Sequence, residues 1–269
     1  MNNNIGIIGI GNITQILLKR LIDNKFKNKV FIYDIDKSNK KFSKGNKIIF
    51  KKSLEEVSSS ADLILIAVKP KNYIKVCSNL KNFINSKTVI MSLMAGVKSE
   101  NISKYFDIPT LPIMRVMTNI NAKFGHAATF LYHNRYVTNK NLNTINAFWK
   151  NFGSVNNVKS EIEIDKVTAL LGSGPAYFLE FTQSFIKVLQ NFGFSKEKSN
   201  KYACELFFGT AFFCNNDARN IEKIKQTVAS KGGTTESALR TLKKRKFQKI
   251  LEESIFDAFK KAKSISKEG

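Results

Sequence analysis

The sequence is short of cysteine, of long apolar runs and of acidic side chains, and each shortage excludes a class of protein. Three cysteines without metal-type spacing predict neither a disulfide framework nor a metal site, so we expect reduced, structural thiols. The longest apolar runs, such as residues 63–68, fall far short of the roughly 18 residues that cross a bilayer. The first residues lack the pattern of a signal peptide. We therefore expect a soluble cytoplasmic protein without a membrane partner.

The shortage of acids leaves a large positive charge. Lys and Arg number 44 against 21 Asp and Glu, which gives a formal charge of +23. A nucleic-acid-binding protein would gather such charge into a stripe and carry a recognisable binding motif. Here the lysines are spread along the whole chain among many Asn, Ile and Phe residues, which favours compositional drift. Nucleic-acid binding stays open as a distant alternative, and we expect no nucleic-acid partner.

The first half of the sequence alternates short apolar runs with segments long enough for helices. Its apolar runs predict strands at residues 5–8, 30–33, 47–50, 61–68 and 88–93. Residues 13–22 show helical spacing. This pattern predicts an α/β fold with a parallel sheet and helices on both faces. Residues 109–114 and 127–132 are expected to add strands at the edge of the sheet.

The second half changes to long segments of helical spacing. Residues 165–189, 196–214 and 247–265 repeat apolar side chains at helical intervals and contain no proline beyond Pro175. We predict an all-α C-terminal domain after a boundary within residues 156–161. The apolar face that includes Phe178, Phe181, Phe185 and Val188 exceeds what a small monomeric bundle buries, which favours a dimer.

A glycine turn separates the first predicted strand from the helix that follows. Gly9 would permit the turn, and Gly11 would let the backbone approach a dinucleotide pyrophosphate at the helix N-terminus. Asp34 ends the second strand, where an acid accepts hydrogen bonds from an adenine-ribose 2′-hydroxyl, which favours NADH. Three lysines within residues 37–41 would instead hold the 2′-phosphate of NADPH. The choice of cofactor therefore stays open.

Five later segments sharpen this interpretation. They are Ala-Val-Lys-Pro at 67–70, Met-Ala-Gly at 94–96, Arg-Val-Met-Thr-Asn at 115–119, residues 165–177, and Ser-Lys-Gly-Gly-Thr-Thr at 230–235. In this order and spacing, over nearly the whole chain, they resemble the pyrroline-5-carboxylate reductase family. The paired glycines and two threonines of the last segment also predict, by themselves, a nest of backbone N–H groups that suits a carboxylate. An ordinary capped helix is the alternative for that loop alone.

The resemblance implies an architecture and an activity. It implies an N-terminal Rossmann-like dinucleotide-binding domain over residues 1–160 and an all-α C-terminal dimerisation domain over residues 161–269. The implied reaction is reduction of 1-pyrroline-5-carboxylate to L-proline by hydride transfer from NADPH or NADH, the last step of proline biosynthesis. The expected partners are this small substrate and a second copy of the chain, with a larger ring of dimers left open.

The resemblance also assigns site residues. Thr168 would lie beside nicotinamide and substrate as the candidate catalytic group. The pyrophosphate would be held by Ile8, Gly9, Ile10, Gly11, Asn12 and Ile13, and the nicotinamide half lined by Ala67, Val68, Lys69, Pro70, Met94, Ala95, Gly96 and Asn119. The substrate would be gripped by Ser230, Gly233, Thr234 and Thr235, with Glu161 and Thr227 near it. No metal ligand is implied.

Two departures keep alternatives open. Thr118 and Lys231 stand where the family usually has proline, and both changes remove loop rigidity. A reductase paralogue with another substrate is therefore one alternative. A β-hydroxyacid-dehydrogenase-like enzyme is another, but it needs a catalytic lysine early in the long helix, and residues 172–190 offer only Lys187.

Overall fold

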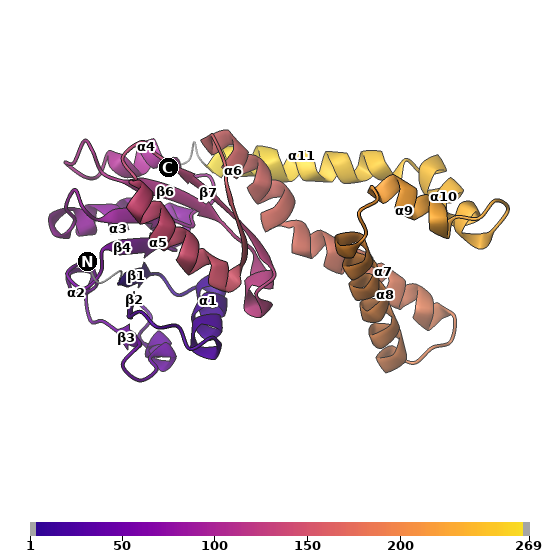
Figure 1. Cartoon of the computed structure of the whole chain (residues 1–269), viewed down its shortest axis with the longest axis horizontal. Helices are drawn as coiled ribbons and strands as arrows, with labels where there is room; N and C mark the ends of the chain where they lie inside the picture. The colour runs from indigo at the N-terminus through magenta and orange to yellow at the C-terminus, as the bar shows by residue number, and fades with distance from the viewer. Residues whose placement is uncertain (1–3, 266–269) are drawn as a thin grey trace. The chain divides into compact units, whose positions relative to one another are not determined.

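The computed structural model describes residues 4–265, which divide into two compact units. The first unit holds the chain up to Ser173 and the residues from Asp257 on, and the second holds Gly174–Phe256. In the first unit the described residues form one sheet of 8 strands in the order β3-β2-β1-β4-β5-β6-β7-β8 (Figure 1). The strands are β1 (Ile5–Ile8), β2 (Val30–Tyr33), β3 (Ile48–Phe50), β4 (Leu63–Ile66), β5 (Val89–Ser92), β6 (Ile113–Met117), β7 (Ala127–His133) and β8 (Gly153–Asn157).

The sheet is parallel except where β6 meets β7. The predicted fold class and the first five strands are confirmed. The edge position predicted for the next two strands is wrong, because β8 pairs with β7 and places β6 and β7 inside the sheet. The strand predicted at 109–114 also starts too early. β6 begins just after Pro112, whose nitrogen has no hydrogen for a strand ladder.

Helices cover both faces of this sheet. One face carries α1 (Asn12–Asp23) and α5 (Asn139–Trp149), whose apolar sides join one buried cluster with β1, β4 and β5. The other face carries α2 (Leu54–Ser58), α3 (Tyr73–Leu80) and α4 (Ser99–Ser103), which build a second cluster. Helix α6 (Glu161–Val167) and a π-helical turn, η6 (Thr168–Gly172), complete the part before Ser173.

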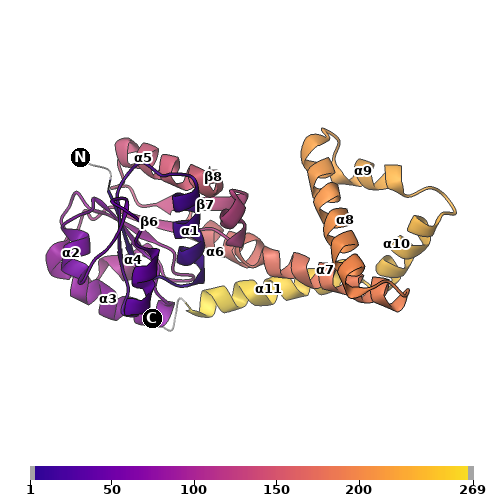
Figure 2. The ribbon, with the colours of Figure 1, turned by 90° about the horizontal axis from the view of Figure 1, so that it is seen from below.

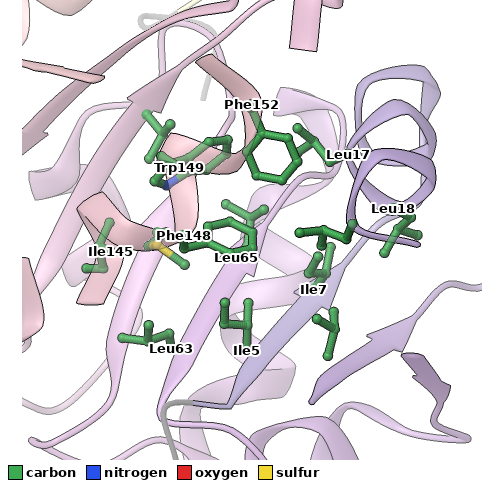
Figure 3. Packing of buried hydrophobic residues seen from close by; sticks show 14 of the residues in the cluster. Ile5, Ile7, Leu17, Leu18, Leu63, Leu65, Ile145, Phe148, Trp149 and Phe152 are labelled. Carbon is green, nitrogen blue, oxygen red and sulfur yellow. The ribbon is translucent and has the colours of Figure 1, made fainter. Parts of the chain in front are cut away.

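Three aromatic side chains from the end of α5 and the turn after it fill part of the core. Trp149, Phe148 and Phe152 are buried beside Leu17 of α1 and Leu65 of β4 (Figure 3). The Phe148 ring lies 5.2 Å from that of Trp149 and 5.3 Å from that of Phe152, both edge to face. Burying a large apolar side chain stabilises a fold by about 1.5–3 kcal/mol. This group therefore fixes α1, whose first residues face the candidate site.

The second unit is helical throughout its described elements, as predicted. It contains α7 (Gly174–Asn191), α8 (Lys196–Asn216), α9 (Ile221–Val228), α10 (Thr234–Lys244) and the first part of α11 (Phe247–Ile265), as Figure 2 shows. Ring pairs at 5.3 Å, Phe185 with Phe207 and Phe181 with Phe247, join α7 to α8 and to α11. Phe178 is nevertheless 66% exposed, Phe208 75% and Phe212 62%. One copy of the unit leaves much of its apolar surface uncovered.

The compact units divide thirteen residues after the predicted boundary at 160/161, because α6 packs against β6 and β7. The predicted domain ranges, 1–160 and 161–269, stay a prediction. Within residues 4–265, no helix combines the length and the apolar character needed to cross a membrane.

Candidate active site

The parallel strands of the first unit end at the same level. Ile8 pairs with Tyr33 of β2 and with Ile66 of β4, and Ile66 pairs with Ser92 of β5. Because these strands run in one direction, the loops that follow them leave the sheet at one edge. That edge is where open α/β sheets bind ligands. The structure thus brings the predicted cofactor residues of four loops together.

The glycine turn after β1 tolerates no side chain at its first position. Gly9 has φ +94°, a backbone conformation that side chains rarely adopt. A Cβ there would lie 2.9 Å from the carbonyl carbon and oxygen of Ala67 and 2.8 Å from the Cγ1 atom of Val68. The Gly9 N–H donates to the Tyr33 carbonyl at 3.0 Å. Gly9 is therefore required by the turn itself.

The N-terminus of α1 offers its backbone to a ligand. Gly11 caps the helix with extended backbone and no side-chain cap bond, and the first turn contains no acid. A Cβ built on Gly11 would meet nothing within 4 Å. The amides of Asn12 and Ile13 are thus left to an external acceptor, and helix N-termini favour anions. This arrangement fits a dinucleotide pyrophosphate.

Asp34 is tied to the glycine turn. Its Oδ2 atom accepts the N–H of Ile10 at 2.5 Å, and its Oδ1 atom accepts the N–H of Asp36 at 2.8 Å. A carboxylate has about four acceptor positions, so two remain for hydroxyl donors. Asp34 therefore stands at the end of β2 with a fixed orientation, as a ribose ligand requires.

The loops after β4 and β5 present mainly backbone groups at this edge of the sheet. Lys69 caps the short helix η2 (Pro70–Asn72), and Pro70 takes its first position, where a missing N–H costs nothing. After β5 the Met94 N–H donates to Ser92 Oγ at 3.2 Å, and Gly96 has φ +75°. The structure therefore places the predicted nicotinamide-lining residues in two tight, defined turns.

Asn119 joins the loop after β6 to the π-helical turn η6. Its Oδ1 atom accepts the Asn121 N–H at 3.1 Å, and its Nδ2 atom donates to the Leu171 carbonyl at 3.0 Å. Thr118, one of the departures from the family, bonds Thr129 of β7 at 3.0 Å between hydroxyl oxygens, which restrains this loop without a proline. π-Helical turns are frequent at functional sites.

Thr168 begins this turn and is partly exposed. Its hydroxyl donates to the Ile164 carbonyl at 2.7 Å, so its oxygen keeps lone pairs for a substrate or water. To donate a proton instead, the hydroxyl must give up this bond. The predicted role beside the nicotinamide stays a prediction.

An ion cluster around the buried Arg115 was missed from the sequence. Arg115 of β6 is 1% exposed and donates from Nη2 to Asp165 Oδ1 at 2.8 Å. Its Nη1 atom lies 3.7 Å from Glu161 Oε2, too far for a hydrogen bond. Burial, and then the negative charge of Glu161, raise the pKa of the Tyr132 hydroxyl on β7. The signal available was an arginine within an otherwise apolar strand.

Glu161 is engaged on its other side as well. Its Oε1 atom accepts the N–H of Ser99, the first residue of α4, at 2.8 Å. Both carboxylate oxygens are thus directed at protein groups. The role predicted for it near the substrate stays a prediction.

The predicted substrate loop belongs to the second unit. Ser230, Gly233, Thr234 and Thr235 surround the start of α10, which Gly233 caps without a side-chain bond. The Gly232 N–H donates to Glu236 Oε2 at 2.6 Å. Thr227, the residue before the last of α9, donates from its hydroxyl to the Ile224 carbonyl at 2.7 Å. The helix start rich in hydroxyl groups is present, but the two glycine N–H groups of the predicted nest are engaged within the loop, because that of Gly233 donates to the Ser230 carbonyl at 3.0 Å.

All three cysteines are unpaired, and burial raises the pKa of Cys77 to about 12, which keeps it a neutral thiol. No cluster of three His, Cys, Asp or Glu side chains suited to a metal occurs within residues 4–265.

Two protein families match separate parts of the chain. Residues 161–265 match the family described as pyrroline-5-carboxylate reductase dimerisation, and residues 4–96 match the one described as NADP oxidoreductase coenzyme F420-dependent. A pyrroline-5-carboxylate reductase of Staphylococcus haemolyticus is 28% identical over 263 residues, which cover 96% of each chain.

Two solved structures are similar to this chain over almost its whole length. A pyrroline-5-carboxylate reductase from Coxiella burnetii has a TM-score of 0.88 and 27% identity, with 99% of each chain covered. A Plasmodium falciparum pyrroline carboxylate reductase with NADP bound has a TM-score of 0.89 over 98% of each chain, and at 24% identity shows the shared fold.

Proposed function

The chain belongs to the pyrroline-5-carboxylate reductase family, and we propose that it reduces 1-pyrroline-5-carboxylate to L-proline with NADPH or NADH. The observation that carries the proposal is the register of the strand ends. It gathers a glycine turn, an acid and two tight loops at one edge, next to the loop that holds η6. Such an edge suits a dinucleotide extended across it.

The proposed reaction needs little acid–base catalysis by the protein. Bound NADPH or NADH supplies the hydride, which adds to C5 of the ring while the C=N bond becomes an amine. The imine accepts it readily when its nitrogen is protonated, and a cyclic iminium forms near neutral pH without a strong enzymic acid. Catalysis by this chain is therefore mainly positioning.

Each predicted residue group has a task in that positioning. Backbone groups of residues 8–13 would hold the pyrophosphate, and those of residues 67–70 and 94–96, with Asn119, would line the nicotinamide half. Thr168 would contact the substrate nitrogen directly or through water. The loop at Ser230, Gly233, Thr234 and Thr235, with Thr227 near it, would bind the substrate carboxylate through N–H and hydroxyl donors.

Asp34→Asn is expected to shift the preference between the two cofactors. The variant keeps an acceptor for the Ile10 N–H but removes the charge that repels a 2′-phosphate. The ratio of kcat/KM with NADH to kcat/KM with NADPH should fall about tenfold, since an ionised acceptor strengthens a hydrogen bond by about 1 kcal/mol or more. Parallel kinetics with both cofactors measure this ratio. An unchanged ratio would show that Asp34 serves only the glycine turn.

Thr235→Ala is expected to weaken substrate binding selectively. Loss of one hydroxyl donor should raise the KM for pyrroline-5-carboxylate about tenfold and leave the cofactor KM within about twofold. Thr241→Ala is the matched control, because that hydroxyl lies on the same helix and donates to the Ser237 carbonyl at 3.3 Å. Equal effects on both KM values would remove Thr235 from the substrate site.

We also propose a homodimer formed through the second unit, whose apolar residues are exposed in one copy and whose sequence matches a dimerisation family. A larger ring of dimers is the alternative, and light scattering at several protein concentrations distinguishes it from a single dimer. The unpaired thiols are consistent with a reducing compartment, so we propose a cytoplasmic location.

One assay tests the central proposal. Purified protein is supplied with pyrroline-5-carboxylate and either NADH or NADPH, and both cofactor oxidation and proline formation are followed. We expect stoichiometric proline with at least one cofactor. No turnover with either would favour a paralogue that acts on another substrate.

A further inference from the structure

The buried side chains of Arg115 and Asp165 form an ion cluster with the partly exposed Glu161, and none of the three is predicted to contact the cofactor itself. We propose that this cluster is a positioning device, which holds η6 and the loop before α4 at the nicotinamide end of the sheet. The inference rests on the proposed function. It assigns roles to Arg115 and Asp165 and gives Glu161 a role in place of direct substrate contact.

The first connection runs from the sheet to α6. Arg115 lies in the centre of β6, paired with Ser92 on one side and Tyr132 on the other, so the sheet restrains its backbone. Its guanidinium holds Asp165, which is 4% exposed and three residues before Thr168. α6 continues directly into η6. The ion pair therefore fixes the helix turn that carries Thr168.

The second connection runs from the cluster to the loop after β5. Glu161 accepts the amide of Ser99, three residues after Gly96, whose loop is predicted to line the nicotinamide half. The same carboxylate faces Arg115 at 3.7 Å. One arginine is thus linked to both segments that flank the proposed site of hydride transfer.

The chemistry of the cluster favours positioning over stability. Two carboxylates face one guanidinium, and the buried Nη1 atom of Arg115 has no hydrogen-bond partner in the described structure. Apolar residues of equal volume often stabilise a core as well as a buried ion pair does. A charged group with a fixed fork does something that apolar packing does not, because it sets the direction of two separate elements.

The test uses Asp165→Asn and Arg115→Lys in the full-length protein. Asp165→Asn keeps the volume and an acceptor, whereas Arg115→Lys keeps the charge and loses the fork. We expect kcat to fall roughly tenfold to a hundredfold in each, because small displacements of reacting groups are costly, with both KM values within about threefold of wild type. Glu100→Gln is the matched control, since it breaks the exposed ion pair between this residue of α4 and Lys104, which follows the helix, and should leave kcat unchanged.

A second readout does not depend on turnover. Hydrogen–deuterium exchange should rise in residues 94–99 and 161–173 of both cluster variants and stay unchanged in residues 5–23. Unchanged exchange in those segments, or wild-type kcat in both variants, would overturn the inference. So would a Glu161→Gln variant that raises the substrate KM alone, since that marks a direct contact. An inactive wild-type protein with the expected exchange pattern would overturn the proposed function and keep the positioning role.

Discussion

Replacing Gly11 with alanine is expected to raise the dissociation constant of the dinucleotide roughly tenfold to a hundredfold, with little change in melting temperature. Gly11 has φ −79°, which alanine adopts freely, and a Cβ there meets no protein atom within 4 Å. The methyl group would occupy the space that a phosphate needs beside the N-terminus of α1. Losing one charge-assisted hydrogen bond costs about 1.5–3 kcal/mol, which corresponds to this change in affinity. Fluorescence titration with NADPH and NADH measures it.

Gly9→Ala is the companion variant with the opposite signature. Its Cβ would press on the Ala67 carbonyl, and its φ of +94° is unfavourable for alanine. Backbone strain of this kind costs about 1–3 kcal/mol, so the melting temperature should fall by several degrees. Unaltered dinucleotide affinity in Gly11→Ala would place the pyrophosphate elsewhere, because nothing else in that variant changes.

Trp149→Ala is expected to destabilise the protein by about 3–5 kcal/mol, since truncating a buried aromatic side chain leaves a cavity. Trp149 is 0% exposed and packs against Phe148 and Phe152 (Figure 3). Urea denaturation followed by circular dichroism is the measurement, because Trp149 is the only tryptophan in the sequence and its removal abolishes tryptophan fluorescence.

Two further variants separate volume from polarity. Trp149→Phe should cost much less, because the buried indole N–H has no hydrogen-bond partner among the described residues and its loss carries no penalty of its own. Phe124→Ala should change stability by no more than about 0.5 kcal/mol, since that ring is 67% exposed. A loss of stability in Trp149→Ala no larger than in Phe124→Ala would contradict the role given to this core.

The strands could be predicted where burial on both faces leaves an unbroken apolar run, as at residues 63–66. β8 could not, because the sequence Gly-Ser-Val-Asn-Asn lies at the sheet edge and is mostly exposed. Its absence from the prediction is the reason that β6 and β7 were assigned to the edge. One missed polar strand thus changed the expected order of its neighbours.

The parts of the candidate site that are local in sequence could also be predicted, whereas contacts between distant residues could not. The glycine turn is local in sequence, so Gly9 and Asp34 could be identified from their distance to apolar runs. The partnership of Arg115 with Asp165 spans 50 residues and depends on α6 returning to the sheet. No local sequence pattern indicates that α6 packs back against the sheet. The bond between Thr118 and Thr129, which compensates for a missing proline, was hidden for the same reason.

The division of the first unit has a consequence for synthesis on the ribosome. This unit draws on the residues from Asp257 on, and Ala262 there is 6% exposed. Domains generally fold as units, in order of their synthesis. Here the nucleotide-binding unit lacks the segment after Phe256 until the whole second unit has been synthesised. A nascent chain stalled at Phe256 should therefore hold that unit in a more protease-sensitive form than the released protein.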